Sequence, residues 1–261
     1  MNKSLIALGM CGLAGLAQAA VVVEAVPYEI DGVAFEGRLI YDDSVATARP
    51  GLLMVPDWMG VTKSSEKQAA LVAADKYVVF MADMYGKAIR PSNAEEAGAA
   101  AGAVRADRAL MRKRAQAAVE VFRARAAEAP LDPGKLGAIG FCFGGGSVLE
   151  LARSGAPLQG FVSFHGNLDT PNPADAQNIQ APVLVLHGAD DPSVPAAQVG
   201  AFMAEMKAAQ ADWQLVSYGG AVHSFTNPEA NNPGRNQYHP QVAARAYRAM
   251  NDLFDEVFAA D

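Results

Sequence analysis

The sequence predicts an α/β fold in which a mostly parallel central sheet is covered by helices on both faces. Short apolar segments typical of buried strands alternate with longer segments of helical periodicity along most of the chain. The 261 residues are 51% hydrophobic, which is enough apolar material to bury both faces of such a sheet. Neither an internal repeat nor a low-complexity linker divides the chain, so we expect a single domain over residues 20–261.

The first half of the chain is predicted to supply four strands and two helical regions. The first two strands are joined by an Asp31-Gly32 turn, and the strands are expected at 21–26, 33–41, 51–56 and 77–81. One helix is expected over 64–76 with Ser64 as its cap, and a longer helical region over 94–127 with a break near Gly102. The run 105–125 mixes charges of both signs and is interpreted as a solvated helix face.

The second half continues the alternation. A strand is expected to end at Phe141, and helical periodicity follows at 147–153. Further strands are expected at 160–164, 182–186 and 213–217, and further helices at 196–209 and 241–258.

One segment of the second half has the pattern of a catalytic turn between a strand and a helix. Gly140-Phe141-Cys142-Phe143-Gly144 matches the nucleophile elbow G-x-S-x-G with cysteine in place of serine. A Cβ atom at either flanking glycine would collide with the turn or with the following helix. The elbow directs the sulfur at the N-terminus of that helix, where a thiolate is favoured. A glycine-rich turn with a buried, inert cysteine is the alternative interpretation of this segment alone.

Two further strand ends carry residues that suit a catalytic triad with Cys142. Asp191 follows the strand at 182–186, and His223 follows the strand at 213–217. The order nucleophile, acid, histidine is that of the α/β-hydrolase fold, and ligands bind beyond the carboxyl ends of parallel strands. His223 would take the thiol proton and later protonate the leaving group, while Asp191 would orient the imidazole. Asp190 stays open as a weaker candidate for the acid.

An early strand end is expected to complete the site. In this fold the oxyanion hole uses the amide after the nucleophile and an amide from a loop after an early strand, here the backbone N–H groups of Phe143 and Trp58. Asp57 lies directly before Trp58 and is either a functional charge or a turn cap. Of the other histidines, we expect His165 to be a structural hydrogen-bonding residue.

Neither a metal site nor a cofactor is expected. The chain has four histidines and, besides Cys11 near the N-terminus, only one cysteine, without the close spacing of metal ligands. We expect His187 to be buried behind the loop that carries the acid, and His239 to lie at the surface.

At this point the chain resembles the dienelactone hydrolase family, also called carboxymethylenebutenolidases, over residues 33–258. Five segments carry the resemblance: Val55-Pro56-Asp57-Trp58-Met59-Gly60-Val61, Ala82-Asp83-Met84-Tyr85-Gly86, Gly140-Phe141-Cys142-Phe143-Gly144-Gly145, His187-Gly188-Ala189-Asp190-Asp191 and Gly220-Ala221-Val222-His223-Ser224-Phe225. The resemblance implies a cysteine nucleophile that forms an acyl-enzyme with lactones or activated esters. It also implies that an acidic residue at the position of Asp57 helps to activate the thiol, although members with glutamate there have one methylene more reach.

One departure from the family bears on the substrate. Members that hydrolyse dienelactone hold its carboxylate with arginines, one of which lies four residues after the histidine, where this chain has Asn227. Arg90 and Arg105 are the candidates to replace that arginine. Without such a replacement, neutral esters or lactones are the expected substrates.

The first nineteen residues are predicted to be a bacterial signal peptide. Lys3 precedes an apolar run at 5–16, and Ala17-Gln18-Ala19 forms a cleavage site, so that the mature chain would begin at Ala20. The run is too short to span a membrane. A lipid-modified Cys11 is the competing interpretation. Export to the periplasm or beyond would leave Cys142 as the only cysteine, and an unpaired cysteine in an oxidising compartment favours a functional role.

The remaining sequence features separate the function classes. A net charge of −7 argues against a nucleic-acid partner, and no later run is long enough to span a membrane. The expected function is an exported hydrolase of ester or lactone bonds, acting on a small molecule as a monomer or small homo-oligomer. A catalytically silent binding protein of the same fold, or a peptidase or thioesterase using the same triad, are the alternatives. The C-x-x-C pair of a thiol redox protein is absent.

Overall fold

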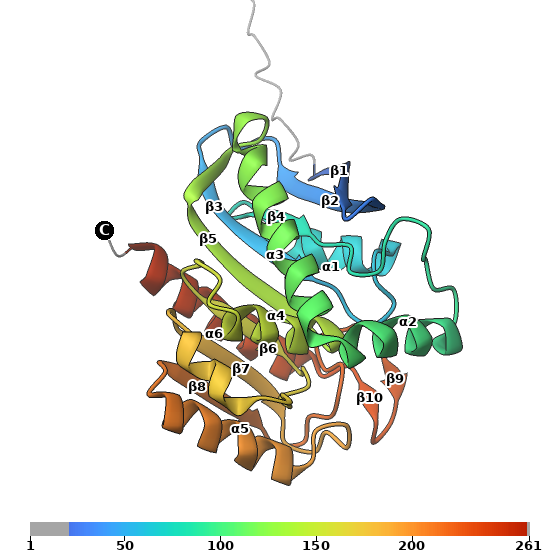
Figure 1. Ribbon diagram of the computed structural model, residues 1–261, viewed down its shortest axis with the longest axis vertical. Coiled ribbons are helices and arrows are strands. Elements are labelled where there is room, and N and C mark those ends of the chain that lie inside the picture. The colour runs from blue at the N-terminus through green and yellow to red at the C-terminus, as the bar shows by residue number, and fades with distance from the viewer. Residues whose placement is uncertain (1–20, 260–261) are drawn as a thin grey trace, which may run out of the picture.

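A computed structural model describes residues 21–259 and shows a twisted sheet with helices on both faces (Figure 1). The predicted signal peptide and its cleavage site lie outside the described residues. The strand order is β1-β2-β4-β3-β5-β6-β7-β8. β2 is antiparallel to β1 and β4, and all other neighbours in the sheet are parallel. The predicted mostly parallel sheet and the α/β-hydrolase fold class are therefore confirmed.

The elements follow the predicted alternation. The strands of the sheet are β1 (Val21–Ile30), β2 (Val33–Asp42), β3 (Arg49–Val55), β4 (Val78–Met81), β5 (Leu131–Phe141), β6 (Phe161–Phe164), β7 (Val183–Gly188) and β8 (Trp213–Tyr218). The α-helices are α1 (Lys63–Ala73), α2 (Ala94–Ala106), α3 (Arg108–Ala124), α4 (Phe143–Arg153), α5 (Ala196–Ala209) and α6 (Pro240–Ala259). Two 3₁₀ turns, η1 (Arg125–Ala127) and η2 (Pro173–Asn178), and a small hairpin of β9 (Asn231–Asn232) and β10 (Asn236–Gln237) complete the order.

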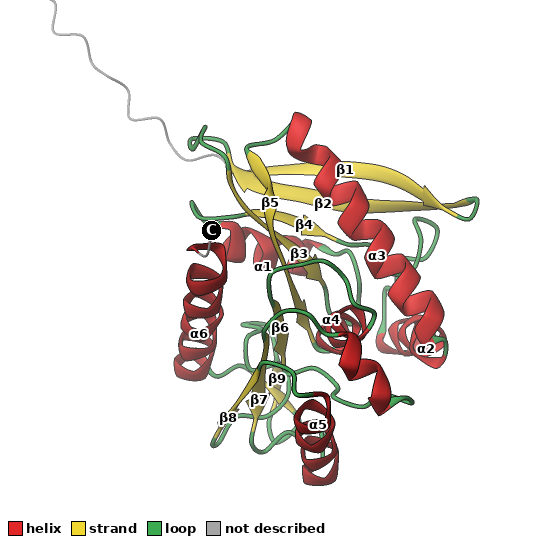
Figure 2. Cartoon of the chain, turned by 60° about the vertical axis from the view of Figure 1, so that its left-hand side comes forward, coloured by secondary structure: helices red, strands yellow, loops and turns green. Residues whose placement is uncertain are grey.

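The core consists of two apolar layers, one on each face of the sheet. Successive residues of β3 alternate between them: Leu53 and Val55 join the layer under α2 to α5, whereas Leu52 and Met54 join the layer under α1 and α6. Figure 2 shows α1 and α6 on one side of the sheet and α2 to α5 on the other. Strands that are apolar on both faces are typical of parallel sheets buried between helices, which explains their short, continuous apolar runs.

The start of α1 differs from the prediction. Thr62, not Ser64, is the N-cap: its hydroxyl accepts a hydrogen bond from the Ser65 amide at 3.1 Å, and the Ser65 hydroxyl accepts one from the Thr62 amide at 2.8 Å. This reciprocal capping box satisfies two amides, whereas a cap at Ser64 alone would satisfy one. The helix therefore begins one residue before the predicted cap.

The predicted break near Gly102 is wrong. The helix continues through Gly102 to Ala106, and Asp107 separates α2 from α3 while accepting a hydrogen bond from the Leu110 amide at 2.9 Å. A glycine inside a helix costs about 1 kcal/mol, which a packed helix tolerates, whereas an aspartate actively caps a new helix. The capping residue, not the glycine, decides where the region divides.

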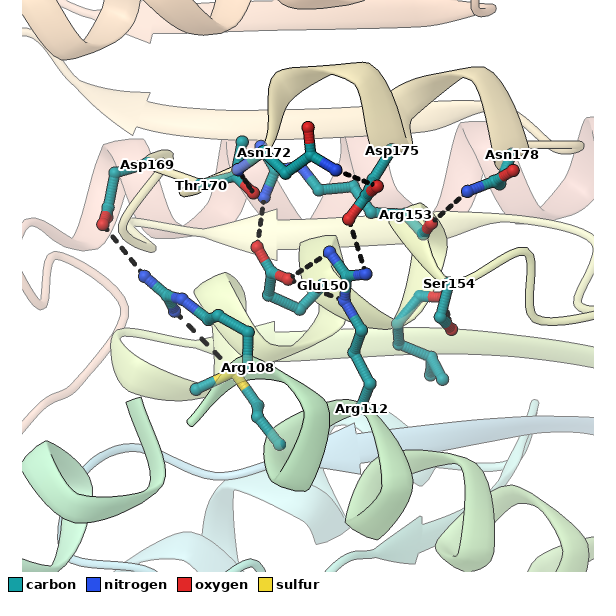
Figure 3. A network of polar contacts seen from close by, with 12 residues as sticks. Arg108, Arg112, Glu150, Arg153, Ser154, Asp169, Thr170, Asn172, Asp175 and Asn178 are labelled. Carbon is teal, nitrogen blue, oxygen red and sulfur yellow. Dashed lines mark hydrogen bonds and ion pairs between the residues drawn. The ribbon is translucent and has the colours of Figure 1, made fainter. Parts of the chain in front are cut away.

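The interpretation of 105–125 as a solvated face is also wrong in part, because Arg112 binds a largely buried ion-pair network that includes two residues of α4 (Figure 3). Arg153 binds Glu205 at 2.7 Å and Glu150 at 3.0 Å. Arg112 of α3 binds the other oxygen of Glu150 at 2.7 Å and Asp175 of η2 at 2.6 Å. This network connects α3, α4, α5 and η2, and so fixes the helix that follows the predicted nucleophile.

Candidate active site

The predicted elbow forms a tight turn between β5 and α4. Cys142 has a φ of 55°, a conformation that costs a non-glycine residue energy and is concentrated at functional sites. A Cβ at Gly140 would lie 2.0 Å from the carbonyl oxygen of Gly144, and one at Gly144 would lie 2.0 Å from that of Val55. The predicted steric need for both glycines is confirmed. α4 begins at Phe143, directly after the cysteine and four residues before the predicted helical segment.

The loops after β7 and β8 bring Asp191 and His223 together. The Asp191 Oδ2 atom and the His223 Nδ1 atom are 2.7 Å apart, and the Ser193 amide donates to Asp191 Oδ1 at 2.8 Å. Both Asp191 and His223 are buried, whereas Asp190 is exposed. Of the two candidate carboxylates, Asp191 is therefore the one that meets the histidine.

The environment of His223 favours its protonated form. Burial alone would lower the pKa of His223, but its hydrogen bonds and charge interactions with Asp191 and Cys142 outweigh burial and raise the pKa to about 10. An imidazolium beside the sulfur can stabilise a thiolate and can later return a proton to a leaving group.

His165 lies beside His223 and stays neutral. Burial, and next the charge of His223, hold the pKa of His165 well below its usual value. Its Nε2 atom is 2.8 Å from the hydroxyl of Thr226, and its ring packs edge-on against His223 with 5.2 Å between ring centroids. The predicted hydrogen-bonding role is confirmed, and the neutral ring adds no like charge beside His223. His187 is buried as expected, while His239 is only partly exposed.

The two predicted oxyanion amides lie at the end of β3 and at the start of α4. Within residues 21–259, neither the Trp58 nor the Phe143 amide donates a hydrogen bond to a protein acceptor. Asp57 Oδ1 accepts a hydrogen bond from the Met59 amide at 2.9 Å, so the expected turn cap is present. Burial raises the pKa of Asp57, against smaller lowering effects of that amide and of His223. Asp57 is therefore both a turn cap and a carboxyl group within the electrostatic range of the histidine.

Tyr85 and the β9–β10 hairpin also shape the site, and sequence reasoning did not assign them a role. The Tyr85 hydroxyl donates to the Trp58 carbonyl at 2.8 Å, and its ring packs against Phe143. Tyr85 follows the end of β4, so the rule that sites lie beyond strand ends could have found it. The hairpin holds the backbone of His223, whose carbonyl accepts from the Gln237 amide at 3.0 Å. Strands of two residues leave no sequence signal.

The model of the "Dienelactone hydrolase family" matches residues 35–258. The chain belongs to the dienelactone hydrolase family. This membership confirms the predicted family and identifies the protein as a hydrolase. The placement of Cys142, Asp191 and His223 on three strand ends agrees with the order of nucleophile, acid and histidine expected for this fold.

The chain is similar to named proteins of the same family. A solved structure of a dienelactone hydrolase-like promiscuous phosphotriesterase from metagenomic libraries is 38% identical, with a TM-score of 0.84 over 91% of this chain and 99% of that chain. A "Putative carboxymethylenebutenolidase" of Saccharolobus solfataricus is 33% identical over 47% of this chain and 45% of its own length. A "Probable 2-oxo-3-(5-oxofuran-2-ylidene)propanoate lactonase" of Bradyrhizobium sp. is 28% identical over 81% of this chain and 86% of its own length. This chain thus spans less than half of the Saccharolobus relative.

Both arginines that could replace the family's carboxylate-binding arginine are engaged within the protein. Arg90 binds the buried carboxylate of Asp83 at 2.9 Å and donates to the Gly86 carbonyl at 2.8 Å. Arg105 binds Asp169 at 2.6 Å. Asn227 uses its side-chain oxygen to accept from the Glu229 amide at 2.9 Å. Both arginine charges are therefore already paired, and Asn227 offers an uncharged amide where the family has that arginine.

Two further features of the described residues concern cofactors and membranes. Over residues 21–259, no group of three or more histidine, cysteine, aspartate or glutamate side chains is arranged to hold a metal ion. In the same range, none of the helices combines the length and apolar character needed to cross a bilayer.

Proposed function

We propose that this dienelactone hydrolase family member hydrolyses neutral esters or lactones through a thioester on Cys142, with His223 and Asp191 as its partners. The observation that carries the proposal is the buried Asp191–His223 pair, with 2.7 Å between its polar atoms, beside a cysteine held at positive φ. The unengaged amides of Trp58 and Phe143 are the proposed oxyanion hole.

The proposed reaction has two steps. In the first, the Cys142 thiolate attacks the carbonyl carbon, the C–O bond to the alcohol breaks, and the alkoxide takes a proton from the His223 imidazolium. In the second, His223 takes a proton from water, the hydroxide attacks the thioester, and the C–S bond breaks to release the acid and the thiolate. Asp191 stabilises the imidazolium in the resting enzyme and after each proton transfer to the ring.

Labelling and mutation of Cys142 test the assignment of the nucleophile. We expect Cys142→Ala to lower turnover of 4-nitrophenyl acetate by at least about 10³-fold, because the thioester cannot form. Mass spectrometry of acid-quenched wild-type protein should find an added acetyl group on Cys142. Met203→Ala, a change on the exposed face of α5, is the matched control and should keep full activity. Near-normal rates in Cys142→Ala would refute the assignment.

We assign Asp57 the role of assisting ionisation of the thiol, because its carboxylate interacts with the charge of His223 and so favours the imidazolium that pairs with the thiolate. Asp57→Asn keeps an oxygen for the Met59 amide and removes the charge, whereas Asp57→Ala removes both. The proposal predicts an equal loss of acylation rate in the two variants, with a lower melting temperature only in Asp57→Ala. A normal acylation rate in Asp57→Asn would leave the turn cap as its only role.

The engaged states of Arg90 and Arg105 support a neutral substrate. An arginine–carboxylate pair is a charge-assisted interaction worth about 1.5–3 kcal/mol, and the substrate would have no such partner here. Neutral esters should therefore show a kcat/KM at least as high as matched esters that carry a free carboxylate. A strong preference for the anionic member that weakens with added salt would contradict this substrate class.

Neutral phosphotriesters are a second candidate substrate class, supported by the similarity to the metagenomic phosphotriesterase. The thiolate would attack phosphorus and expel an alkoxide or phenoxide, and water would then cleave the P–S bond. Incubation with paraoxon should yield 4-nitrophenol and a transient diethylphosphoryl group on Cys142. Absence of both products would remove this candidate and leave ester hydrolysis intact.

Export is also part of the proposal, supported by the apolar run and the Ala17-Gln18-Ala19 site. Expression of the full chain in a Gram-negative bacterium should give periplasmic protein. Its measured mass should equal that of a chain that begins at Ala20. Unprocessed protein in the cytoplasm would contradict export without affecting the catalytic proposal.

A further inference from the structure

The loop that follows β4 contacts both segments that carry the proposed oxyanion amides. The Tyr85 hydroxyl donates a hydrogen bond to the Trp58 carbonyl at 2.8 Å. The Tyr85 ring packs against the ring of Phe143, with 5.7 Å between the two centroids. Tyr85 is buried, so both contacts lie inside the protein. One side chain therefore connects the turn after β3 to the first residue of α4.

The hydroxyl of Tyr85 holds the turn that contains Trp58. In this turn, residues 57–60, the Gly60 amide donates to the Asp57 carbonyl at 2.9 Å. The central peptide of such a turn, here between Trp58 and Met59, can adopt two opposite orientations, those of type I and type II turns. Its amide donates to Asp57 Oδ1 at 2.9 Å, and its carbonyl accepts from Tyr85. The Trp58 amide belongs to the preceding peptide, so these bonds fix the turn without using that amide.

The ring of Tyr85 also limits where the turn can move. Gly60 has a φ of 74°, and a Cβ atom built on it would lie 3.1 Å from a ring carbon of Tyr85. Burial, and next the charges of Asp57 and Cys142, raise the pKa of Tyr85. The hydroxyl therefore stays protonated and remains a hydrogen-bond donor. The ring and the hydroxyl together contact both the second and the last residue of the turn.

Tyr85 is held in its turn by the buried carboxylate of Asp83. Asp83 Oδ1 accepts hydrogen bonds from the amides of Tyr85 and Gly86, each at 3.0 Å. Asp83 Oδ2 accepts from the Glu36 amide at 3.1 Å and from the Arg90 guanidinium at 2.9 Å. Arg90 thus balances the charge of a carboxylate that fixes the backbone at Tyr85. This contact gives Arg90 a place in the protein that needs no substrate.

We propose that Tyr85 is a positioning residue for the oxyanion hole, which fixes the spacing of the Trp58 and Phe143 amides through its hydroxyl and its ring. The inference rests on the proposed function, in which these amides stabilise the oxyanion that forms when the thiolate attacks a carbonyl. Such donors are effective because they are held in place before the reaction, and a displacement of about 1 Å can cost roughly 10²-fold in rate. Tyr85 acts through the two amides and is assigned no contact with the substrate.

Comparison of two reactions of Cys142 tests this role. Tyr85→Phe keeps the ring and removes the hydroxyl, and we expect it to lower kcat/KM for 4-nitrophenyl acetate about 10- to 100-fold. Alkylation of Cys142 by iodoacetamide forms no oxyanion, so its rate and pH profile should stay within about twofold. Tyr77→Phe removes another buried tyrosine hydroxyl, which donates to Asn251 at 3.1 Å, and is the matched control that should change neither rate. An equal loss in both reactions of Tyr85→Phe, or an unchanged kcat/KM, would overturn the proposal.

A reversible adduct separates this inference from the proposed function. When hexyl trifluoromethyl ketone binds, the Cys142 sulfur forms a bond to the carbonyl carbon, the π pair moves to the oxygen, and no group leaves. Its Kd, measured by fluorine NMR, should rise about tenfold or more in Tyr85→Phe and stay within about twofold in Tyr77→Phe. An equal Kd in wild type and Tyr85→Phe would overturn the positioning role.

The outcome for the wild-type protein distinguishes the two failures. A wild-type protein that forms the adduct with the expected dependence on Tyr85, yet hydrolyses no ester, would refute the proposed function and leave the positioning role standing. A wild-type protein that forms no adduct would contradict both.

Discussion

The polar groups at the two ends of α4 differ in whether they have hydrogen-bond or ion-pair partners. At its C-terminal end, Glu150 and Arg153 are fully buried, and each has ion-pair partners at 2.7–3.0 Å. At its N-terminal end, Cys142 has a strained backbone, and the amides of Trp58 and Phe143 have no acceptor among the described residues. One helix thus connects a fully satisfied network to an incompletely satisfied one.

The difference indicates which polar cluster builds the fold and which is the candidate for chemistry. A buried network whose members are all paired fixes the packing of its elements and has no capacity left for a ligand. Strain and unused donors persist only where the surrounding structure enforces them, and they gather at functional sites. Changes at the two ends of α4 should therefore have separable effects on stability and on turnover.

Breaking the satisfied network should give the largest effect on stability. Arg153→Met leaves Glu150 and Glu205 buried with too few partners, and we expect it to lower the free energy of unfolding by about 3–5 kcal/mol. The kcat of the remaining folded protein should stay within about twofold. Urea unfolding and active-site titration measure the two quantities. Arg105→Met, which breaks a pair at the surface, is the control and should cost under about 1 kcal/mol. A large loss of kcat at unchanged stability would contradict the comparison.

Removing the charge of Asp191 should have the opposite outcome, with a large effect on turnover rather than on stability. Asp191→Asn should lower kcat/KM by roughly 10²-fold or more, because the imidazolium loses the carboxylate that stabilises it. Asp190→Asn, at the exposed neighbouring position, should stay within about twofold. If Asp190→Asn proves the more damaging change in ester hydrolysis, the proposed acid is the wrong one.

The pH dependence of stability and of kcat/KM should show the contribution of the Asp191–His223 pair. The pKa of His223 is raised to about 10 in the folded protein, above its ordinary value near 6.5, so protonation stabilises the fold below pH 6.5. That stabilisation should be lost as the pH rises towards 10, and kcat/KM should decline over the alkaline part of that range. Asp191→Asn should move the decline to lower pH. An unmoved decline would mean that another group titrates there.

Relief of the backbone strain at Cys142 should give the smallest effect on stability. This change should raise the stability rather than lower it. Glycine adopts positive φ without the penalty of a Cβ atom, so Cys142→Gly should be about 1 kcal/mol more stable than Cys142→Ala. Both variants should be inactive. Thermal unfolding compares them directly, and equal melting temperatures would show that the elbow stores little strain.

The strand ends could be predicted from the sequence because parallel strands buried on both faces leave short apolar runs. Cys142, Asp191 and His223 each follow such a run, so their convergence at one edge could be predicted before any contact was known. Helix boundaries are less predictable, because several neighbouring polar residues can each serve as the N-cap. Thr62 and Asp107 are the residues that do so at α1 and α3.

Contacts between distant segments could not be predicted. One cavity is lined by Gln68 of α1, Thr226 of a loop and Tyr247 of α6. The spacing of these residues in the sequence does not predict that they lie close together. The same holds for Arg112. The charge pattern around it is typical of a solvated helix face, but its guanidinium pairs with Glu150 and Asp175. Side-chain direction within a helix decides such cases, and it depends on how neighbouring elements pack.

The position of His223 after β8, the last strand of the sheet, has a consequence for synthesis. A nascent chain released or stalled before this loop carries Cys142 but lacks His223, so under the proposed mechanism its thiol cannot complete a catalytic cycle. α6 follows still later and closes one of the two apolar layers. The ribosome therefore adds the proposed nucleophile well before its proposed base, and the proposed hydrolysis can begin only after all eight strands of the sheet have been made.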